Sequence, residues 1–439
     1  MDKIIKGFSK LSREEKLETL IETHQLPGDF RDRLAEFRHP GKQDLFDGFS
    51  ENTLSNYFLP FGVVPNFLID GNTYALPLVV EESSVVAAAG RAATFWAQNG
   101  GFRNTIHGTL KKGHIWFRWD GPSERITPIR QNLIERLREA VAPITAGMEK
   151  RGGGIHDMAI EPLTDHPDLF QLVVTFETVD SMGANFINSC LEEMKQPLQE
   201  YFKSETKPGP FKEPEIIMAI LSNHTTECLI TTHVECPVDQ LAPFSGDLTP
   251  ETFARRFKTA VDIAVADTSR AVTHNKGIFN GIDAIVIATG NDFRAVEAAG
   301  HAWAARDGQY RSLSQCDITE EGMFRLELSL PLALGTVGGL TRLHPLASLA
   351  LEMLGNPSAQ QLMGIAASAG LANNFSAVAS LVTTGIQKGH MKLHLSNLLA
   401  SLNATPGEKE AAMQYFRDKN VSAQAVKAFL TDYQNTKDR

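Results

Sequence analysis

One stretch of the chain reads His274-Asn275-Lys276-Gly277-Ile278-Phe279-Asn280-Gly281-Ile282-Asp283 and continues through Ala284-Ile285-Val286-Ile287-Ala288 into Thr289-Gly290-Asn291-Asp292. A lysine and a glycine turn precede five apolar residues, and a second glycine turn ends in a carboxylate. This pattern predicts a buried strand over residues 284–288 with a polar group at each end. A lysine and an aspartate placed in this way suit a site that stabilises negative charge developing on a carbonyl oxygen.

Helices are expected on both sides of this stretch. Thr249 and Pro250 have the pattern of an N-cap and a first helical residue, and the helix that follows is expected to lead to Arg270 and Lys276. Downstream, the sequence predicts a helix over 294–305, a strand over 323–330, a glycine loop over 335–339 and a helix over 358–374. The glycine loop allows close approach of a ligand, although an ordinary turn explains it equally well.

The first part of the chain predicts a helical arm followed by a hairpin. Residues 1–48 are charged and helical in pattern, with Ser12 as an N-cap. Asp70-Gly71 between two apolar runs is a strong hairpin signal. Glu81-Glu82-Ser83-Ser84 then precedes small residues that are typical of a closely packed helix. These four polar residues suit the N-terminus of that helix, either as part of a site or simply as its cap.

The sequence pattern of residues 110–223 differs from that of the flanking residues and predicts a separate unit of strands and helices. Strands are expected over 114–119 and 170–176, with a helix over 129–146 between them. Asp180-Ser181-Met182-Gly183-Ala184-Asn185 then joins a strand to a helix start, an arrangement that lets backbone amides approach a phosphate. The turn lacks the Gly-x-Gly-x-x-Gly pattern, so a purely structural turn fits the same residues.

The composition excludes several classes of protein. With 439 residues, of which 42% are hydrophobic, the chain has room for two or three domains. A net charge of −10 without basic runs argues against nucleic-acid binding. The N-terminus lacks a signal-peptide pattern, and no run of about 18 uninterrupted apolar residues predicts a membrane span. The four cysteines suggest neither disulfides nor a metal site, so a cytoplasmic protein is expected.

The motifs together resemble 3-hydroxy-3-methylglutaryl-coenzyme A (HMG-CoA) reductase, in its soluble bacterial class II form. Seven motifs occur in the order of that family, from about Glu51 to the C-terminal tail. They are Glu51-Asn52 with Leu59-Pro60, Glu81-Glu82-x-Ser84-Val85-Val86-Ala87, Asp180-x-Met182-Gly183-Ala184-Asn185, His274-Asn275-Lys276-Gly277, Gly290-Asn291-Asp292, Gly335-Thr336-Val337-Gly338-Gly339 and Gly389-His390-Met391. The resemblance favours the functional interpretation of each motif over the structural one.

The resemblance implies a catalytic role for four residues. They are Glu82, Lys276, Asp292 and His390. Lys276 would stabilise the oxyanion formed at each hydride addition, and Asp292 would hold the lysine. His390 would protonate the departing coenzyme A thiolate, and Glu82 would supply a proton at the aldehyde stage. The implied reaction reduces the HMG-CoA thioester to mevalonate and free coenzyme A, through mevaldyl-coenzyme A and mevaldehyde.

The resemblance also implies the binding residues. The acyl group would contact Ser84, Arg270 and Asn280, with Arg270 as the partner of its terminal carboxylate. NADH or NADPH would be bound without a metal by Asp180, Met182, Gly183, Asn185, Asn223 and Asn373. Some positions depart from the family pattern, namely Ser83 for Pro, Ser181 for Ala, Phe293 for Trp and Asn373 for Gln. None of these departures removes a group that the reaction needs.

The fold that the resemblance implies is α+β. A large mixed α/β substrate domain, split in sequence, would comprise residues 1–109 and 224–385. An inserted small domain with an antiparallel sheet, residues 110–223, would bind the nucleotide, and residues 386–439 would form a helical flap that carries His390. Relatives form dimers with the site at the subunit interface, so a homodimer or a larger oligomer is expected, with one chain supplying Lys276 and Asp292 and the other the nucleotide turn.

Two other functions remain open on the sequence. One is a different NAD(P)-linked acyl-coenzyme A or hydroxyacid oxidoreductase on the same scaffold. The other is a relative that binds coenzyme A esters without catalysis. The argument against this second function is that all four catalytic positions are filled.

Overall fold

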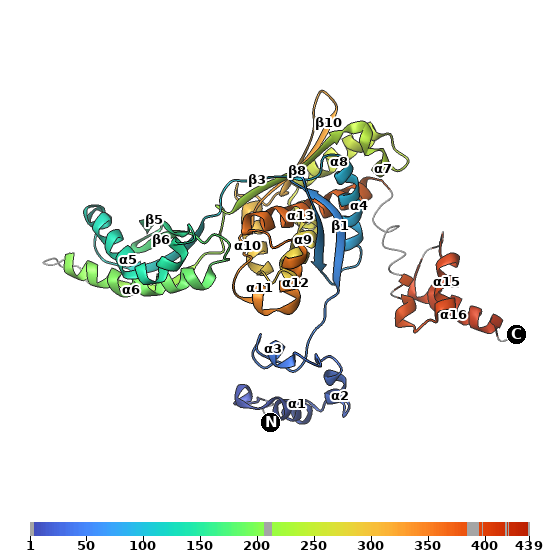
Figure 1. The fold of residues 1–439 in the computed structure, drawn as a ribbon, viewed down its shortest axis with the longest axis horizontal. Helices are drawn as coiled ribbons and strands as arrows, with labels where there is room; N and C mark the ends of the chain where they lie inside the picture. Colours follow the sequence, from blue (N-terminus) through green and yellow to red (C-terminus); the bar gives the residue numbers. More distant parts are fainter. Residues whose placement is uncertain are drawn as a thin grey trace. The chain divides into compact units, whose positions relative to one another are not determined.

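The computed structural model describes residues 4–205, 213–383, 395–396, 398–417, 419 and 421–437 (Figure 1). The chain divides into two compact units, Met1–Pro60 and Phe61–Arg439. His390, which sequence analysis predicts to be catalytic, lies outside the described residues.

The N-terminal unit is helical, as predicted. It contains η1 (Phe8–Lys10), α1 (Arg13–His24), α2 (Phe30–Ala35) and α3 (Gln43–Asp47). The predicted cap is confirmed, because the Ser12 side chain accepts a bond from the Glu15 N–H while the Ser12 N–H donates to the Glu15 carboxylate. This reciprocal pair satisfies two backbone donors that the start of a helix otherwise leaves free.

The second unit begins with the predicted hairpin. Strands β1 (Phe61–Ile69) and β2 (Asn72–Val79) pair antiparallel around Asp70 and Gly71, whose φ angles of 49° and 82° are both positive. Two residues of positive φ form the tight turn that suits the twist of a hairpin. Helix α4 (Val85–Gln98) follows and confirms the helix predicted after Glu82.

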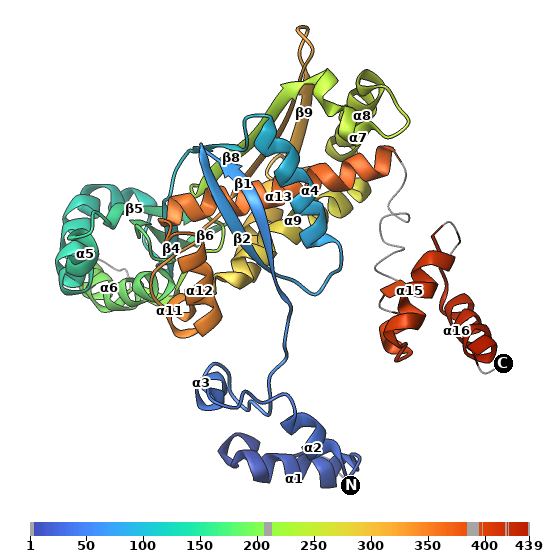
Figure 2. The ribbon, with the colours of Figure 1, turned by 45° about the vertical axis from the view of Figure 1, so that its right-hand side comes forward.

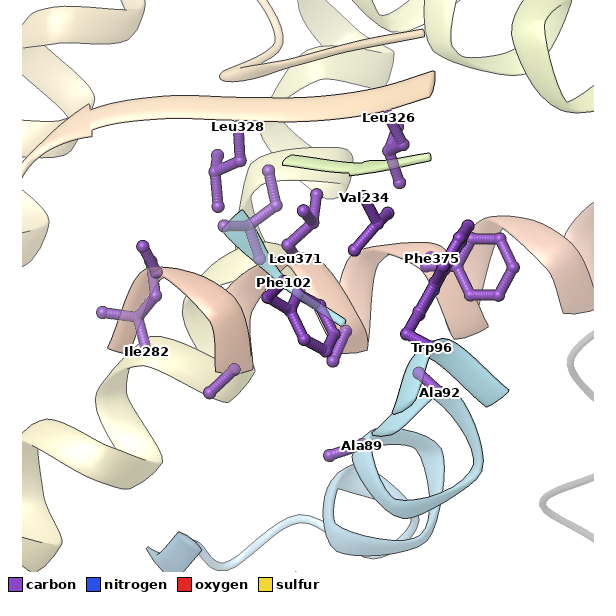
Figure 3. Close-up of a cluster of buried hydrophobic side chains, with 14 of the residues drawn as sticks. Ala89, Ala92, Trp96, Phe102, Val234, Ile282, Leu326, Leu328, Leu371 and Phe375 are labelled. Carbon is purple, nitrogen blue, oxygen red and sulfur yellow. The ribbon is translucent and has the colours of Figure 1, made fainter. Parts of the chain in front are cut away.

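The larger hydrophobic core is formed by the second sheet and three packed helices. This antiparallel sheet has the order β3-β8-β10-β9, and its strands are β3 (Arg103–Ile106), β8 (Leu229–Pro237), β9 (Ser314–Ile318) and β10 (Met323–Pro331). Helix α13 (Ala359–Val382) packs against this sheet, α4 and α9 (Thr268–Ala288) (Figure 2). Figure 3 shows the buried side chains, Trp96 of α4 and Phe375 of α13 among them, that fill this junction.

A third sheet has its own hydrophobic core. It is antiparallel with the order β5-β6-β4-β7, formed by β4 (Lys111–Arg118), β5 (Gly154–Leu163), β6 (His166–Glu177) and β7 (Glu215–Leu221). Helices α5 (Ile126–Glu149) and α6 (Ala184–Glu205) supply apolar residues to this core, including Leu137 and Leu191. The two separate cores, with helices and antiparallel sheets in each, agree with the predicted α+β class.

The strand predicted over residues 284–288 is wrong, because those residues end helix α9. The helix is buried on nearly every side at this end, with Ala284, Ile285 and Val286 all buried. A helix that is apolar all round shows no polar positions from which to recognise a period of 3.6 residues. Gly281 does not form a turn either, since a Cβ there would lie 2.3 Å from the Ala369 carbonyl oxygen, and its role is to let α9 and α13 approach closely.

The helices that flank α9 also differ from the prediction in one respect. The helix that begins at Thr249 is α8 (Pro250–Ala266), and it ends before Arg270 and Lys276. Those residues belong to α9, which has a new N-cap at Asp267. The other described elements before α13 are α7 (Ala242–Ser245), α10 (Phe293–Ala304), α11 (Leu340–Leu343) and α12 (Pro345–Met353), with η2 (Ser123–Arg125) and η3 (Val238–Leu241).

One helix of the described chain, α13, is long and apolar enough to cross a membrane by length and composition. Within the protein, 78% of its most apolar window is buried, and Ser368, Asn373, Asn374 and Ser376 interrupt it. The packing against α4, α9 and the second sheet accounts for this hydropathy, because a core helix of a globular domain has the same composition.

The C-terminal segment has a small core of its own. It contains α15 (Pro406–Tyr415) and α16 (Ala423–Lys437), and its buried cluster includes Leu399, Phe416 and Val426. Thr405 caps α15 through a reciprocal bond with Glu408. The segment therefore folds locally with few apolar residues.

Candidate active site

A cavity of about 470 Å³ lies between α4, α9 and α13. Six of the residues that sequence analysis predicts for the site line it, namely Glu82, Ser84, Arg270, Lys276, Asn280 and Asn373. They come from three segments far apart in the sequence. The core packing of the three helices therefore assembles this part of the site.

Helix α9 supplies one wall of the cavity. Arg270, Thr273, Gly277 and Asn280 recur at helical spacing, and Lys276 flanks this line. Sequence analysis missed Thr273 and gave no role to His274, which also lines the cavity. Their spacing from Arg270 was a detectable signal, but the expected strand at the end of the stretch concealed it.

Lys276 and Glu82 form an ion pair at the edge of the cavity. Their side chains are 60% and 38% exposed, so both groups remain accessible to a ligand. Glu82 precedes α4, and the nearby N-cap residue Ser84 has a φ of 79°. A left-handed conformation in a residue other than glycine stores about 1–3 kcal/mol of strain, which is common where a side chain must be aimed at a ligand.

His274 forms the buried base of this wall. Its Nε2 lies 2.7 Å from the Ser314 Oγ and 3.0 Å from the Asn374 Nδ2. Both contacts lie on Nε2, whereas the buried Nδ1 has no hydrogen-bond partner within the described part of the chain. Burial, reinforced by the Arg270 guanidinium, lowers the pKa of His274 to about 3, so the ring is neutral at physiological pH.

The charge of the cavity suits an anionic ligand. Arg91, Arg270 and Lys276 are cationic, whereas Glu82 is the only acidic residue among the described residues of its lining. Burial lowers the pKa of the Arg270 guanidinium, which nevertheless stays charged because an arginine titrates far above neutrality. A carboxylate that paired with Arg270 would satisfy a partly desolvated cation.

The turn over residues 180–185 lies outside this cavity, where the third sheet meets α6. Gly183 has a φ of 85°, and a Cβ there would lie 2.5 Å from the Thr178 Cγ2, so the backbone needs glycine. Helix α6 starts at Ala184 and has 22 residues, which places free N–H groups and a partial positive charge beside the turn. This geometry fits the pyrophosphate of a dinucleotide.

The other predicted cofactor residues divide between the two regions. Asn185 and Asn223 are exposed on the sheet side, and the Asn188 Oδ1 accepts a bond from the Leu221 N–H that holds the end of β7 beside α6. The Asp180 carboxylate accepts a bond of 2.7 Å from Ala359 N–H at the start of α13. Asn373, in contrast, lines the cavity between α4, α9 and α13 and donates to the Ala369 carbonyl.

Asp292 is not joined to Lys276 in this chain. Its carboxylate accepts bonds from Arg294 N–H and Ala295 N–H, as the N-cap of α10, and pairs with the Arg294 side chain. From Lys276 to the end of α9 the helix rises about 18 Å, since each residue adds 1.5 Å, and Asp292 follows the next turn. Within the described residues, the structure thus brings Glu82, and not Asp292, to Lys276.

Neither a metal nor a thiol site emerges from the described part of the chain. It holds no group of three or more His, Cys, Asp or Glu side chains that could bind a metal ion. The four cysteines are free and buried. Burial raises the pKa of the Cys190 thiol to about 12 and that of Cys228 to about 11, which leaves them poor nucleophiles.

Comparison with known proteins agrees with this geometry. Residues 12–395 match the family model of hydroxymethylglutaryl-coenzyme A reductase. The chain is 34% identical to the 3-hydroxy-3-methylglutaryl-coenzyme A reductase of Archaeoglobus fulgidus, over 98% of this chain and 94% of the relative. A probable reductase of the same name from Borreliella burgdorferi is 29% identical, over 95% and 94%.

Solved structures give the same result. The 3-hydroxy-3-methylglutaryl-coenzyme A reductase of Streptococcus pneumoniae superposes with a TM-score of 0.71 at 35% identity, covering 98% of this chain and 99% of that one. The class II enzyme of that organism, bound to NADPH in open conformations, gives a TM-score of 0.70 at 35% identity, over 86% and 99%. The chain therefore belongs to the hydroxymethylglutaryl-coenzyme A reductase family and is of the class II bacterial type.

Proposed function

We propose that the cavity between α4, α9 and α13 binds the acyl group of HMG-CoA, and that Lys276 is the electrophilic group of the reaction. The chain is an NAD(P)-dependent oxidoreductase of its family, whose reaction is the four-electron reduction of HMG-CoA to mevalonate in the mevalonate pathway. Two equivalents of NAD(P)H supply the hydrides, two protons are taken up, and free coenzyme A leaves. The substrate and products are therefore HMG-CoA, mevalonate and coenzyme A.

The observation that carries this proposal is the Lys276–Glu82 pair at the mouth of a positively charged cavity. Each hydride addition turns a carbonyl oxygen into an oxyanion, which a neighbouring ammonium stabilises. Glu82 touches the Lys276 ammonium and is thus within reach of the same oxygen. Glu82 delivers the proton that neutralises the oxyanion at the aldehyde stage, and His390 protonates the coenzyme A thiolate.

The remaining side chains of the cavity orient the acyl group. Arg270 pairs with its terminal carboxylate, and Ser84 and Asn280 bond to its oxygen atoms. The strained conformation of Ser84 and the position of Asn280 on the Arg270 face of α9 support these roles.

The second region binds the nicotinamide nucleotide. Asp180, Met182, Gly183 and Asn185 hold the cofactor, with Asn223 at the neighbouring end of β7; the glycine-dependent turn at the start of α6 supports this role. Asn373 is the residue at which the nicotinamide meets the substrate, since it lines the substrate cavity. We accordingly assign residues 110–223 to the small domain, residues 1–109 and 224–385 to the large domain, and residues 386–439 to the flap.

The active form is a homodimer in the cytoplasm. Because Lys276 pairs with Glu82 and Asp292 pairs with Arg294 in the same chain, we replace the expectation that one chain supplies both Lys276 and Asp292. Asp292 of one copy instead approaches Lys276 of the other. Two features support a second copy. Asp292 has no bond to Lys276 within its own chain, and α12 exposes an apolar stripe of Leu346, Leu349 and Met353, each 43–52% exposed. Exposed stripes of this kind mark protein interfaces.

An activity assay tests the proposed function. Purified protein should oxidise NADH or NADPH when HMG-CoA is added, and should reduce NAD⁺ or NADP⁺ with mevalonate and coenzyme A. Acetyl-coenzyme A and glutaryl-coenzyme A serve as control thioesters. No turnover in either direction, or equal turnover with the control thioesters, would contradict the proposal.

A further inference from the structure

Asn291 is the buried residue of the Gly290-Asn291-Asp292 turn, and none of the proposed roles uses it. Its side chain, 8% exposed, bonds with both ends to a single residue of another loop. The Asn291 Nδ2 donates to the Gly335 carbonyl at 3.0 Å, and the Asn291 Oδ1 accepts from the Gly335 N–H at 2.8 Å. This two-bond clamp fixes the position of Gly335 relative to Asp292.

Gly335 in turn touches the nucleotide turn. A Cβ at Gly335 would lie 2.3 Å from the Met182 backbone nitrogen and 2.9 Å from the Ser181 carbonyl carbon. The backbone of the turn therefore rests directly on Gly335, with no space for a side chain between them. Any shift of Gly335 is transmitted to Met182.

The residues after Gly335 tie the same two segments together. Thr336 N–H donates to the Asp180 carbonyl at 2.8 Å, and Val337 forms a β-bridge with Ser181. The Asp180 side chain is bonded on its other side to Ala359 N–H. Residues 180–182 thus lie against loop 335–337, and the Asn291 side chain is bonded to the first residue of that loop.

We propose that Asn291 is a positioning residue for the nicotinamide cofactor. It acts through Gly335 to fix the position of the turn that contains Met182 and Gly183. The position of the cofactor relative to Asp292 is thereby fixed as well. One consequence is that Asp292 and the cofactor turn enter an active site from the same chain, as a preassembled unit. This inference rests on the proposed role of residues 180–185 in cofactor binding.

A matched set of variants tests the clamp by direct binding. In Asn291→Ala the dissociation constant for NADPH, or for NADH, should rise about tenfold, because two bonds to Gly335 are lost. Gly335→Ala should give the same selective loss, since its Cβ displaces Met182. Nicotinamide fluorescence measures the cofactor constant, and titration calorimetry measures the constant for HMG-CoA, which should change less than about twofold in both variants.

Asn275→Ala is the control for loss of a buried asparagine clamp. The Asn275 side chain donates to the Arg311 carbonyl at 2.9 Å and accepts from the Leu313 N–H at 3.0 Å, so it joins two backbone groups as Asn291 does, but at a site away from the nucleotide turn. This variant should melt at a lower temperature with an unchanged cofactor constant. If Asn291→Ala does not fold, Asn291→Asp gives the same readout, because it keeps the bond from Gly335 N–H and loses the donor to Gly335 O.

Two outcomes overturn the proposal. One is a destabilised Asn291 variant that binds the cofactor as tightly as the unsubstituted protein. The other is an equal loss of affinity for cofactor and HMG-CoA. A protein that binds NAD(P)H but does not turn over HMG-CoA would contradict the proposed function and leave the clamp measurable, so the two failures are distinguishable.

Discussion

The proposed substrate cavity and the proposed nucleotide turn are built in opposite ways. The cavity is formed by side chains that project from three long, tightly packed helices, α4, α9 and α13. The turn over residues 180–185 is formed by backbone, with a glycine where a Cβ would collide with Thr178. Side chains recognise the charge of an acyl substrate, whereas backbone amides suit the pyrophosphate that dinucleotides share.

This difference implies different sensitivities to substitution. A change in the cavity should remove one chemical group and leave the frame intact, because the helices are held by the core around Phe375 and Trp96. A change in the turn should alter the path of the backbone itself. Effects on substrate chemistry and on cofactor affinity should therefore separate cleanly.

The largest expected effect is on the cavity side, with Lys276→Met. Loss of the ammonium that stabilises the oxyanion should lower kcat by about 10²–10³-fold. The cofactor dissociation constant, measured by nicotinamide fluorescence, should stay the same, because Lys276 is bonded to Glu82 and not to the turn. A parallel loss of cofactor binding would show that the two regions are not independent.

The next effect is on the turn, with Gly183→Ala. The new Cβ meets Thr178 and the φ of 85° becomes unfavourable, at about 1–3 kcal/mol, which corresponds to roughly 5–150-fold weaker cofactor binding. Affinity for HMG-CoA, measured by calorimetry, is expected to persist. Gly308→Ala has a similar φ of 84° but open space around it, and it provides the control for backbone strain alone.

A third prediction concerns the pH dependence of helix α9, which lines the cavity, with Asp283→Asn. Burial, together with Glu297 of α10 and Glu81 before α4, raises the pKa of Asp283 from 3.8 to about 8. The unfolded chain loses this proton near pH 4 while the folded protein keeps it. The folded state therefore loses stability as pH rises from about 4 to about 8, and the loss is constant above that.

The amide introduced by Asp283→Asn is neutral throughout this range. The gain in stability of the variant should therefore be absent near pH 4, grow toward pH 8 and then level off at about a few kcal/mol or less. Urea unfolding of both proteins at pH 4.5, 7 and 9 measures this difference. A difference that does not vary with pH would show that the substitution acts through packing and not through the retained proton.

The smallest effect on kinetics is expected for Asn373→Ala. This variant tests whether Asn373 acts with the cavity or with the nucleotide turn. Asn373 loses its bond to the Ala369 carbonyl, worth about 1 kcal/mol or roughly fivefold. If the cavity position governs, KM for HMG-CoA should rise more than KM for the cofactor. The reverse ranking in steady-state kinetics would place Asn373 with the nucleotide turn instead.

Local signals predicted much of the fold. The Asp70-Gly71 hairpin, the Ser12 cap and the helix after Ser358 are all present, because each depends on residues close together in sequence. Helix α9 was missed at residues 284–288, because this end is buried on nearly every side and has no polar positions that reveal a period of 3.6 residues. The four catalytic candidates came from family motifs, and these motifs contain no information about which side chains touch.

Short stretches of chain were sufficient to predict the class of fold, the family and the types of residue at the site, because caps, turns and ordered motifs are local. The contacts between those residues depended on tertiary packing. Packing joined Lys276 to Glu82 and not to Asp292, placed Asn373 in the substrate cavity, and made Asn291 a clamp on Gly335. The physical reason is that the Lys276–Glu82 and Asn291–Gly335 contacts join segments 194 and 44 residues apart, whose meeting depends on how α4, α9, α13 and loop 335–337 pack. In the stretch around Lys276, the glycines that suggested turns proved to include one that allows two helices to touch.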